Sequence, residues 1–189
     1  MILMKKFNFD VMKKLLIFLL FIGFVSKELI AQTWTYKAGE DAFDGKYKTS
    51  SITGIGTEWP YINPIFVINI FINNPEYPNI YLSKVPYAGC DNNNVIIKFD
   101  NSEKLFTPAV TTNRANDTWF IDFKKFKAKF INNEWVFEPI GGDENMFEEF
   151  IKMLRSHSKM HIRLQSDCLK YDCVFNLKGS SEALNFIFK

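Results

Sequence analysis

Hydrophobic residues recur at two different periods along the chain, and the change of period divides the sequence into elements. Phe147, Phe150, Ile151 and Leu154 follow one another at i, i+3, i+4 and i+7, the spacing of one face of an α-helix. Asp143 precedes this stripe as a candidate N-cap, and acidic residues fill the first turn. The pattern predicts an amphipathic helix that packs on a core through these four residues.

After this helix the period changes from 3.6 to two. Residues 162–166 and 174–178 each alternate apolar and polar side chains, as half-buried strands do. The segment Leu169–Asp172 is expected to be a four-residue hairpin loop between them. Gly179 then ends the second strand, and Ser180 or Ser181 is expected to cap a short C-terminal helix.

The chain before the helix consists of short apolar runs separated by turn residues. Ile65–Ile72 is almost wholly apolar and is bounded by prolines, which favours a central strand. Asn132 and Asn133 separate two further runs and predict a hairpin. About eight or nine strands and few helices result, so we predict a mostly β fold. The expected architecture is an antiparallel β-sandwich, or an open barrel, with one amphipathic helix before the last hairpin and a short C-terminal helix.

The first 31 residues have the pattern of an export signal. Lysines precede the apolar run Leu15–Val25, and Ala31 is a plausible cleavage point. Because the run is shorter than the roughly 20 residues that cross a bilayer, we expect cleavage and no membrane span afterwards. The predicted organisation is a cleaved signal peptide, residues 1–31, and a single β-sandwich domain, residues 32–189. The protein would then be exported, to the periplasm or the exterior.

Cleavage changes the electrostatic interpretation of the chain. The first 31 residues carry five lysines, Asp10 and Glu28, a net charge of +3, so their removal changes the formal charge from +2 to −1. Nucleic-acid binding normally requires a basic surface on the domain itself. We therefore predict no nucleic-acid partner.

Export also favours disulfide formation, since thiols oxidise outside the cytoplasm. A four-residue loop would set Cys168 opposite Cys173 at a separation that a disulfide tolerates. We therefore expect a Cys168–Cys173 bridge, with Cys90 paired to one of them as the main alternative.

The residues that could carry catalysis or hold a metal form no recognisable motif. His157 and His161 are spaced as a helical zinc pair, but the glutamate of HExxH is missing and the segment lies where helix should give way to strand. His157 is instead expected to cap the carboxyl end of the helix. We predict a non-enzymatic protein with no catalytic residue, no metal and no cofactor.

Several segments together resemble a known family. These are Trp34 followed by DAFDG, then NNNVIIKFDNSE, WFIDF, FEEFIKMLRSHSKMHIRLQSD and FNLKGSSEAL. In this order they resemble small exported β-sandwich proteins related to the type VI secretion-associated VasI family and, more remotely, to the invasion-associated locus B family. The resemblance implies a β-sandwich outside the cytoplasm with a helix before the last hairpin, and it implies no catalytic residue. The chain lacks the cysteine near the start that the invasion-associated proteins favour.

Two functions follow as hypotheses. The first is an exported module that binds a protein partner or supports an envelope or secreted assembly. The alternative is a small ligand- or glycan-binding domain that uses exposed aromatic side chains, and an unrecognised hydrolase comes third. The candidate binding aromatics are Trp59, Tyr61, Tyr77, Tyr81 and Tyr87.

Overall fold

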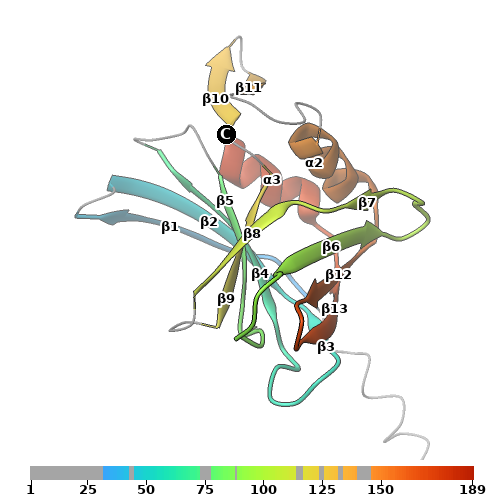
Figure 1. Ribbon diagram of the computed structural model, residues 1–189. Coiled ribbons are helices and arrows are strands. Elements are labelled where there is room, and N and C mark those ends of the chain that lie inside the picture. Colours follow the sequence, from blue (N-terminus) through green and yellow to red (C-terminus); the bar gives the residue numbers. More distant parts are fainter. Residues whose placement is uncertain are drawn as a thin grey trace, which may run out of the picture. The chain divides into compact units, whose positions relative to one another are not determined.

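A computed structural model gives the arrangement of these elements (Figure 1). It describes residues 32–42, 45–72, 78–87, 89–113, 117–123, 126–131, 134–139 and 146–189, with side chains described outside 126–139. The predicted signal peptide, Tyr77 and Asp143 lie outside the described residues. Residues Gln32–Lys189 form one compact unit, and the description below concerns this unit.

The larger of two main sheets is six-stranded and antiparallel throughout, in the order β1-β2-β4-β5-β9-β8. The apolar run predicted as a central strand is β4, and it lies inside this sheet. Its strands are β1 (Thr35–Asp41), β2 (Gly45–Thr53), β4 (Ile65–Phe71), β5 (Asn79–Ser83), β8 (Ala109–Asn113) and β9 (Thr118–Asp122).

The second main sheet is five-stranded and also antiparallel, in the order β3-β13-β12-β6-β7. A separate two-stranded sheet pairs β10 (Phe126–Ile131) with β11 (Glu134–Pro139), so the predicted hairpin pairing is present, and the predicted turn residues Asn132 and Asn133 lie outside the described residues. The strands of the second sheet are β3 (Ile55–Gly56), β6 (Asn94–Phe99), β7 (Leu105–Phe106), β12 (Lys159–Gln165) and β13 (Lys170–Asn176).

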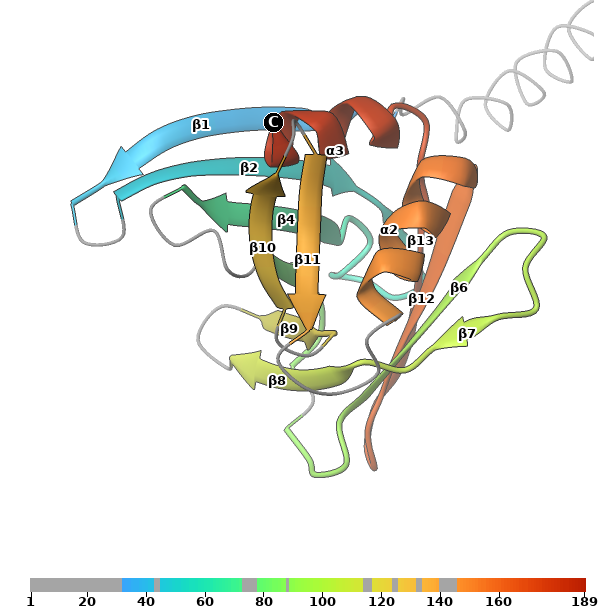
Figure 2. The same ribbon diagram turned by 90° about the horizontal axis from the view of Figure 1, so that it is seen from above.

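Two helices complete the core. The helix α2 (Met146–Ser156) precedes the β12–β13 hairpin, and α3 (Ser180–Phe188) ends the chain. Figure 2 shows both helices on the same side of the six-stranded sheet, and α3 contacts β1, β2 and β4 there. The residues predicted to face the core from α2 are all buried: Phe147, Phe150, Ile151 and Leu154.

Phe150 is the side chain that joins the two sheets and the helix. Its ring lies 6.4 Å from that of Phe66 in the six-stranded sheet and 5.8 Å from that of Phe99 in the five-stranded sheet. The sheets also touch directly, because Phe66 and Phe175 have ring centroids 5.8 Å apart. In the described part of the chain the sheets remain separate hydrogen-bonded units around one core. The mostly β sandwich prediction is therefore confirmed, and the barrel alternative is not supported.

A glycine carries the chain from one sheet to the other. Only Gly54 separates β2 from β3, and a Cβ placed there would lie 2.6 Å from the Phe175 ring and 2.8 Å from the Val174 carbonyl oxygen. Any other residue would force the Phe175 ring or the backbone of β13 to shift at this corner, since real Cβ atoms do not approach so closely. The Tyr171 hydroxyl closes the same corner by donating a hydrogen bond to the carbonyl oxygen of Tyr61 at 2.5 Å.

The predicted N-cap of α3, Ser180 or Ser181, is wrong. The residue at the N-cap is Gly179, which has a φ of 86° and makes no side-chain cap bond. The hydroxyls of Ser180 and Ser181 instead donate to the carbonyl oxygens of Leu154 and Arg155, at 2.5 and 3.5 Å. These are carbonyls at the C-terminal end of α2, where a helix has no partners of its own. The two serines therefore connect the helices.

The predicted disulfide is also wrong, because the hairpin turns three residues earlier than expected. Gln165 pairs with Lys170, so the turn contains Cys168, and Cys173 lies in β13 opposite Ile162. Cys173 faces the core as a buried free thiol. The bridge is Cys90–Cys168, the alternative that the sequence left open.

This bridge joins two loops that are far apart in the sequence. The side-chain amide of Asn92 donates to both carboxylate oxygens of Asp167, at 3.2 and 3.0 Å. The Asp167 N–H also donates to the Asp91 carbonyl oxygen at 3.4 Å. The loop before β6 is therefore bound to the turn between β12 and β13 by covalent and polar contacts together.

Candidate functional site

The outer face of the five-stranded sheet carries a hollow of about 540 Å³. Strand residues alternate between the two faces of a sheet, and in β12 the buried side chains of Met160, Ile162 and Leu164 alternate with the more exposed side chains of His161 and Arg163. The outward side chains are thus separated from the core by the sheet itself. This face is the first candidate for a functional surface.

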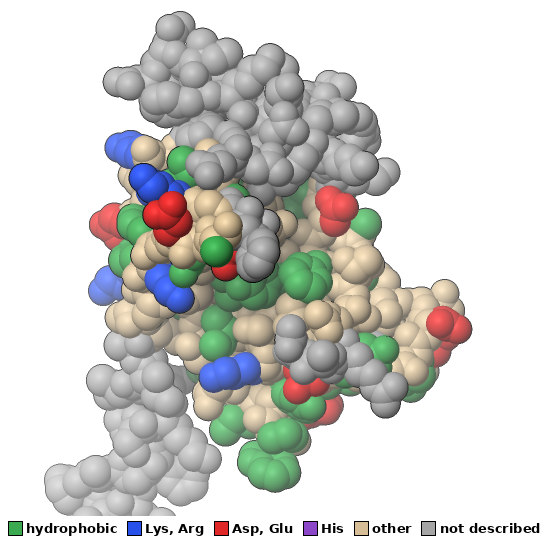
Figure 3. All heavy atoms as spheres, turned by 90° about the vertical axis from the view of Figure 1, so that its left-hand side faces the viewer, with side chains coloured by type: hydrophobic (Ala, Val, Ile, Leu, Met, Phe, Trp, Pro, Cys, Tyr) green, Lys and Arg blue, Asp and Glu red, His purple; other side chains and the backbone are tan. Residues whose placement is uncertain are grey.

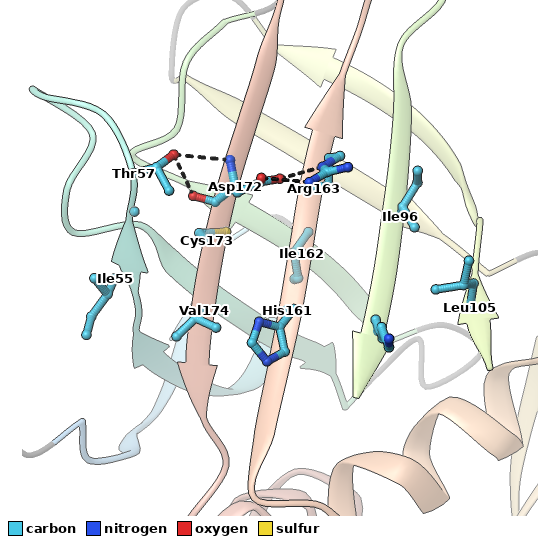
Figure 4. A pocket seen from close by; sticks show the side chains of 12 residues that line it. Ile55, Thr57, Ile96, Leu105, His161, Ile162, Arg163, Asp172, Cys173 and Val174 are labelled. Atoms are coloured by element: carbon cyan, nitrogen blue, oxygen red, sulfur yellow. Dashed lines mark hydrogen bonds and ion pairs between the residues drawn. The ribbon is translucent and has the colours of Figure 1, made fainter. Parts of the chain in front are cut away.

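One cross-strand row runs along the whole width of this face. The register places Ile55 opposite Val174, Val174 opposite His161, His161 opposite Lys98, and Lys98 opposite Leu105. Figure 4 shows the Ile55, Val174 and His161 side chains in succession across three strands. Ile55 and Leu105, at the two edges, are 56% and 55% exposed. The row is therefore apolar at both ends and basic towards its middle.

A second row lies beside the first. Arg163 pairs across the sheet with Asp172 on one side and with Ile96 on the other. The Nε and Nη2 groups of Arg163 donate to the two carboxylate oxygens of Asp172, at 2.7 and 2.9 Å. The hydrogen bond from Arg163 holds the pKa of the Asp172 carboxyl below its usual range, against a smaller opposing effect of partial burial. The pair remains ionised and its two members satisfy each other.

The edge of this second row is fixed by backbone contacts. The N–H of Thr57 donates to the carbonyl oxygen of Asp172 at 3.1 Å, and the Asp172 N–H donates to the Thr57 hydroxyl at 3.3 Å. Figure 4 draws the bonds that the Thr57 hydroxyl makes with the backbone of Asp172. Together these contacts continue the pairing of β13 beyond the short strand β3. The apolar side chain of Ile55 is thereby held on a rigid edge.

The thiol and the carboxylate of this face are each buried or already paired. The Cys173 thiol lies under the face and is buried, and burial is the main reason that its pKa is raised above the ordinary value. A thiol of this kind stays protonated and is a poor nucleophile. Asp172 is engaged with Arg163 as described, which leaves Lys98 and His161 as the polar groups directed outward among apolar side chains.

The two histidines have separate roles, as expected from their positions. A ring nitrogen of His157, Nδ1, lies 3.1 Å from the Met153 carbonyl oxygen in the last turn of α2, and the His157 N–H donates to the same oxygen. His157 therefore ends the helix, as predicted, whereas His161 lies in β12. Among the described residues, no group of three or more histidine, cysteine or acidic side chains is placed to hold a metal ion.

The predicted binding aromatics lie in different segments of the fold. Trp59, 85% exposed, and Tyr61, which packs against the core, lie in the connection between β3 and β4. Tyr81 lies in β5 with its ring 5.6 Å from that of Phe120 in the neighbouring β9, and Tyr87 lies in the loop before β6. Of these residues, Tyr81 lines a second hollow, on the outer face of the six-stranded sheet.

The sequence did not reveal the first candidate surface, because its members come from five strands. Ile55 and Leu105 lie in strands of two residues each, too short to show any alternation. The signal that was present is the alternation in β12 and β13, which marks the outward residues. The order in which strands of this sheet pair is a tertiary property that periodicity does not contain.

Comparison with protein families, with curated proteins and with solved structures finds no match to this chain. The resemblance to the VasI and invasion-associated families therefore stays a prediction. In the ranges that the structure describes, no helix is long and apolar enough to cross a membrane.

Proposed function

We propose that this protein is an exported, non-enzymatic module that binds a protein partner through the outer face of its five-stranded sheet. The observation that carries the proposal is the pair of cross-strand rows, in which apolar side chains from separate strands adjoin one hollow. Exposed apolar side chains are common singly, but a group of them around one hollow is typical of an interaction surface. The Cys90–Cys168 bridge supports export, since disulfides persist in oxidising compartments.

The charge of this face indicates the chemistry of the partner. Lys98 and Arg163 are basic and Asp172 is the acidic residue of the two rows, so the face has a net positive charge before His161 is counted. A basic group surrounded by apolar side chains complements an apolar surface that carries a carboxylate. The proposed partner is therefore a protein with an acidic, apolar segment.

The rigidity of the face favours this function further. Its side chains stand on five paired strands, and the Cys90–Cys168 bridge ties β6 to the β12–β13 hairpin at one end. A surface that is already ordered loses little conformational entropy when a partner binds. The face is thus suited to a binding role without a change in the fold.

Site-specific photo-crosslinking tests the proposal in the cells that make the protein. A benzophenone amino acid is placed at Ile55 or at Leu105, and at Ile72 as the control. Ile72 is an isoleucine of similar exposure, 46%, and it directly follows β4 of the other sheet. We expect an adduct of one defined mass from both test positions and none from Ile72, and mass spectrometry then identifies the attached protein.

A charge reversal shows whether the adduct depends on the proposed chemistry. Lys98→Glu should remove most of the crosslinking at Ile55, whereas Lys152→Glu, on the exposed side of α2, should leave it unchanged. Equal adducts from all three positions, or no adduct from Ile55 and Leu105, would contradict the proposal. An adduct of twice the chain mass would show that the face joins two copies of the protein and not a different partner.

A further inference from the structure

The outer face of the six-stranded sheet contains a second hollow, of about 520 Å³, made from different side chains. The positions of β4 on this face are Ile65, Val67, Asn69 and Phe71, of which Val67 is buried in the floor of the hollow and the others are half-buried, whereas Phe66, Ile68 and Ile70 face the core. Cross-strand neighbours from β1, β2 and β5 complete the lining. This hollow, called the Tyr81 groove below, is independent of the face assigned to the protein partner.

Aromatic side chains stand at two separated places in the Tyr81 groove. Tyr81 is paired with Val67, and its ring contacts that of Phe120 at 5.6 Å. Tyr47 is paired with Phe71, and these two rings are 6.2 Å apart. Val67 and Phe71 are four residues apart in one strand, which corresponds to about 13 Å. The groove therefore offers two aromatic platforms with a space between them.

Hydroxyl and amide groups fill this space. The Thr49 hydroxyl donates to Asn69 Oδ1 at 2.8 Å, which fixes the orientation of the amide and leaves its Nδ2 group, with two hydrogens, as a donor. Ser51 also lines the groove, and its hydroxyl oxygen lies 2.7 Å from that of Thr35 beside the groove. A ligand between the aromatic platforms would thus meet both donors and acceptors.

The groove has balanced charge. Its lining includes one basic residue, Lys37, and one acidic residue, Asp41, both from the edge strand β1. The Lys37 ammonium group lies 5.6 Å from the centroid of the Tyr47 ring. Figure 3, which views the side where β1 and β2 project, shows hydrophobic side chains gathered near the centre with basic and acidic ones around them. Such a lining does not select a strongly charged ligand.

A glycine in the edge strand holds the Tyr47 platform in place. Gly39 pairs with Tyr47 across β1 and β2, and a Cβ at Gly39 would lie 2.6 Å from the Tyr47 hydroxyl oxygen and 2.7 Å from its ring carbon Cζ. The ring therefore leans over the glycine and covers the space that a side chain would occupy. This arrangement keeps Tyr47 along the sheet surface.

We propose that the Tyr81 groove binds a neutral oligosaccharide, whose sugar rings lie on Tyr81 and Tyr47 and whose hydroxyls bond to Asn69 and Thr49. Sugar rings have apolar C–H faces that pack on aromatic rings, and their hydroxyls both donate and accept, as the polar strip does. A site with an apolar surface and a few placed polar groups is typical of a small-ligand site. A peptide would more readily pair with an exposed strand edge than with this face.

The test begins with an array of neutral and anionic glycans, and titration calorimetry measures the affinity of each one retained. We expect neutral oligosaccharides among the retained glycans. Tyr81→Ala and Asn69→Ala should each weaken the binding of these by about tenfold, because one removes the platform and the other removes the fixed donor. Trp59→Ala is the matched control: it removes an aromatic side chain that is more exposed but lies outside the groove, and it should leave the affinity unchanged.

Several results would overturn this assignment. These are retention of anionic glycans alone, retention of no glycan at all, or a loss in Trp59→Ala equal to that in Tyr81→Ala. Tyr81→Phe guards against a folding defect, since it keeps the ring and should keep most of the affinity. The crosslinks from Ile55 and Leu105 should be unaffected by all variants of the Tyr81 groove. Glycan binding and partner binding are therefore tested independently of each other.

Discussion

The two faces of the five-stranded sheet are formed by the same strands, but one face is packed in the core and the other is exposed to solvent. On the inner face Met160, Ile162 and Leu164 are at most 1% exposed, and they share the core with α2 and the other sheet. On the outer face His161 and Arg163, from the same strand, stand in solvent beside exposed apolar residues. The inner residues are constrained by packing, whereas the outer ones are open to selection for binding. Substitutions on the two faces should therefore differ sharply in their effect on stability.

The largest effect on stability is expected from Phe150→Ala, which leaves a cavity in the core between the two sheets. The Phe150 ring contacts Phe99 and Phe106 of the five-stranded sheet, Phe66 of the other sheet, and Phe123, whose ring centroid is 4.3 Å away. Removal of a buried phenylalanine lowers the free energy of unfolding by about 3 to 5 kcal/mol. Urea denaturation measures this loss.

Lys152→Ala in the same helix is the control for Phe150→Ala. Lys152 is exposed on the opposite side of α2, so its replacement should change the free energy of unfolding by less than about 0.5 kcal/mol. If Phe150→Ala were as mild as this control, α2 would not pack between the sheets in solution, and the comparison of the two faces would lose its basis.

The next effect concerns the end of the sheet, where the Cys90–Cys168 bridge joins two loops. The cysteines are 78 residues apart in sequence, and the chain-entropy model gives about 4.5 kcal/mol for a loop of this length. Measured values are usually lower, so we expect the Cys90→Ser, Cys168→Ser double variant to lose about 2 to 4 kcal/mol. Urea denaturation of the oxidised protein and of the double variant measures this difference.

Thiol labelling distinguishes the two possible pairings directly. With the Cys90–Cys168 bridge, the native protein should show no reactive thiol, and unfolding without reductant should expose one, at Cys173. Peptide mapping that finds a fragment containing Cys168 bridged to Cys173 would contradict the structure and restore the pairing expected from the sequence.

The β12–β13 hairpin shows which structural features the sequence pattern predicted and which it did not. The alternation over residues 174–178 identified the second half of β13, and the stripe of α2 identified its buried side chains, because both signals are local. The predicted turn was three residues too late, since the Ser166 N–H and the Leu169 carbonyl oxygen close the observed turn by a backbone hydrogen bond of 2.9 Å, which periodicity does not encode. That small error moved Cys168 into the turn and changed its partner.

Other elements were missed for a different physical reason. The edge strands β1 and β8 have no buried position, so they show no strong alternation and no strand was predicted at either place. Both candidate surfaces likewise depend on strand order, which brings Ile55 beside Val174 and Tyr47 beside Phe71. Local pattern therefore predicted the inner faces of the sheets, and the outer faces required the structure.

A smaller effect is expected at alkaline pH, from the inward thiol of Cys173. Burial raises the pKa of this thiol above its ordinary value, so above about pH 8.5 the unfolded chain loses the proton while the native protein keeps it. The stability from this group is complete below that pH and is lost as the pH rises. We expect a fall of about 1 kcal/mol between pH 8.5 and 9.5, measured by urea denaturation.

Cys173→Ala separates this titration from other alkaline effects. The variant should be less stable at neutral pH, because it leaves a small cavity, but its stability should be nearly constant between pH 8.5 and 9.5. An unchanged slope in the variant would assign the alkaline loss to other groups. Tyr171, whose pKa is raised mainly by burial, adds to the loss from about pH 10 upward.

The smallest effect is expected on the outer face, at the Arg163–Asp172 pair. The two side chains are 43% and 41% exposed, and ion pairs of this exposure contribute about 0.2 to 1 kcal/mol. A double-mutant cycle with Arg163→Gln and Asp172→Asn, measured by urea denaturation at pH 7, should give a coupling energy in this range. Because the Arg163 hydrogen bond lowers the pKa of the Asp172 carboxyl, the coupling is present above the ordinary aspartate pKa of about 3.9 and is lost as the pH falls through the lower native value. High salt should weaken it further. A coupling above about 2 kcal/mol at pH 7 would show that the pair is removed from water, and the outer face would then belong to the packed interior and not to an open binding surface.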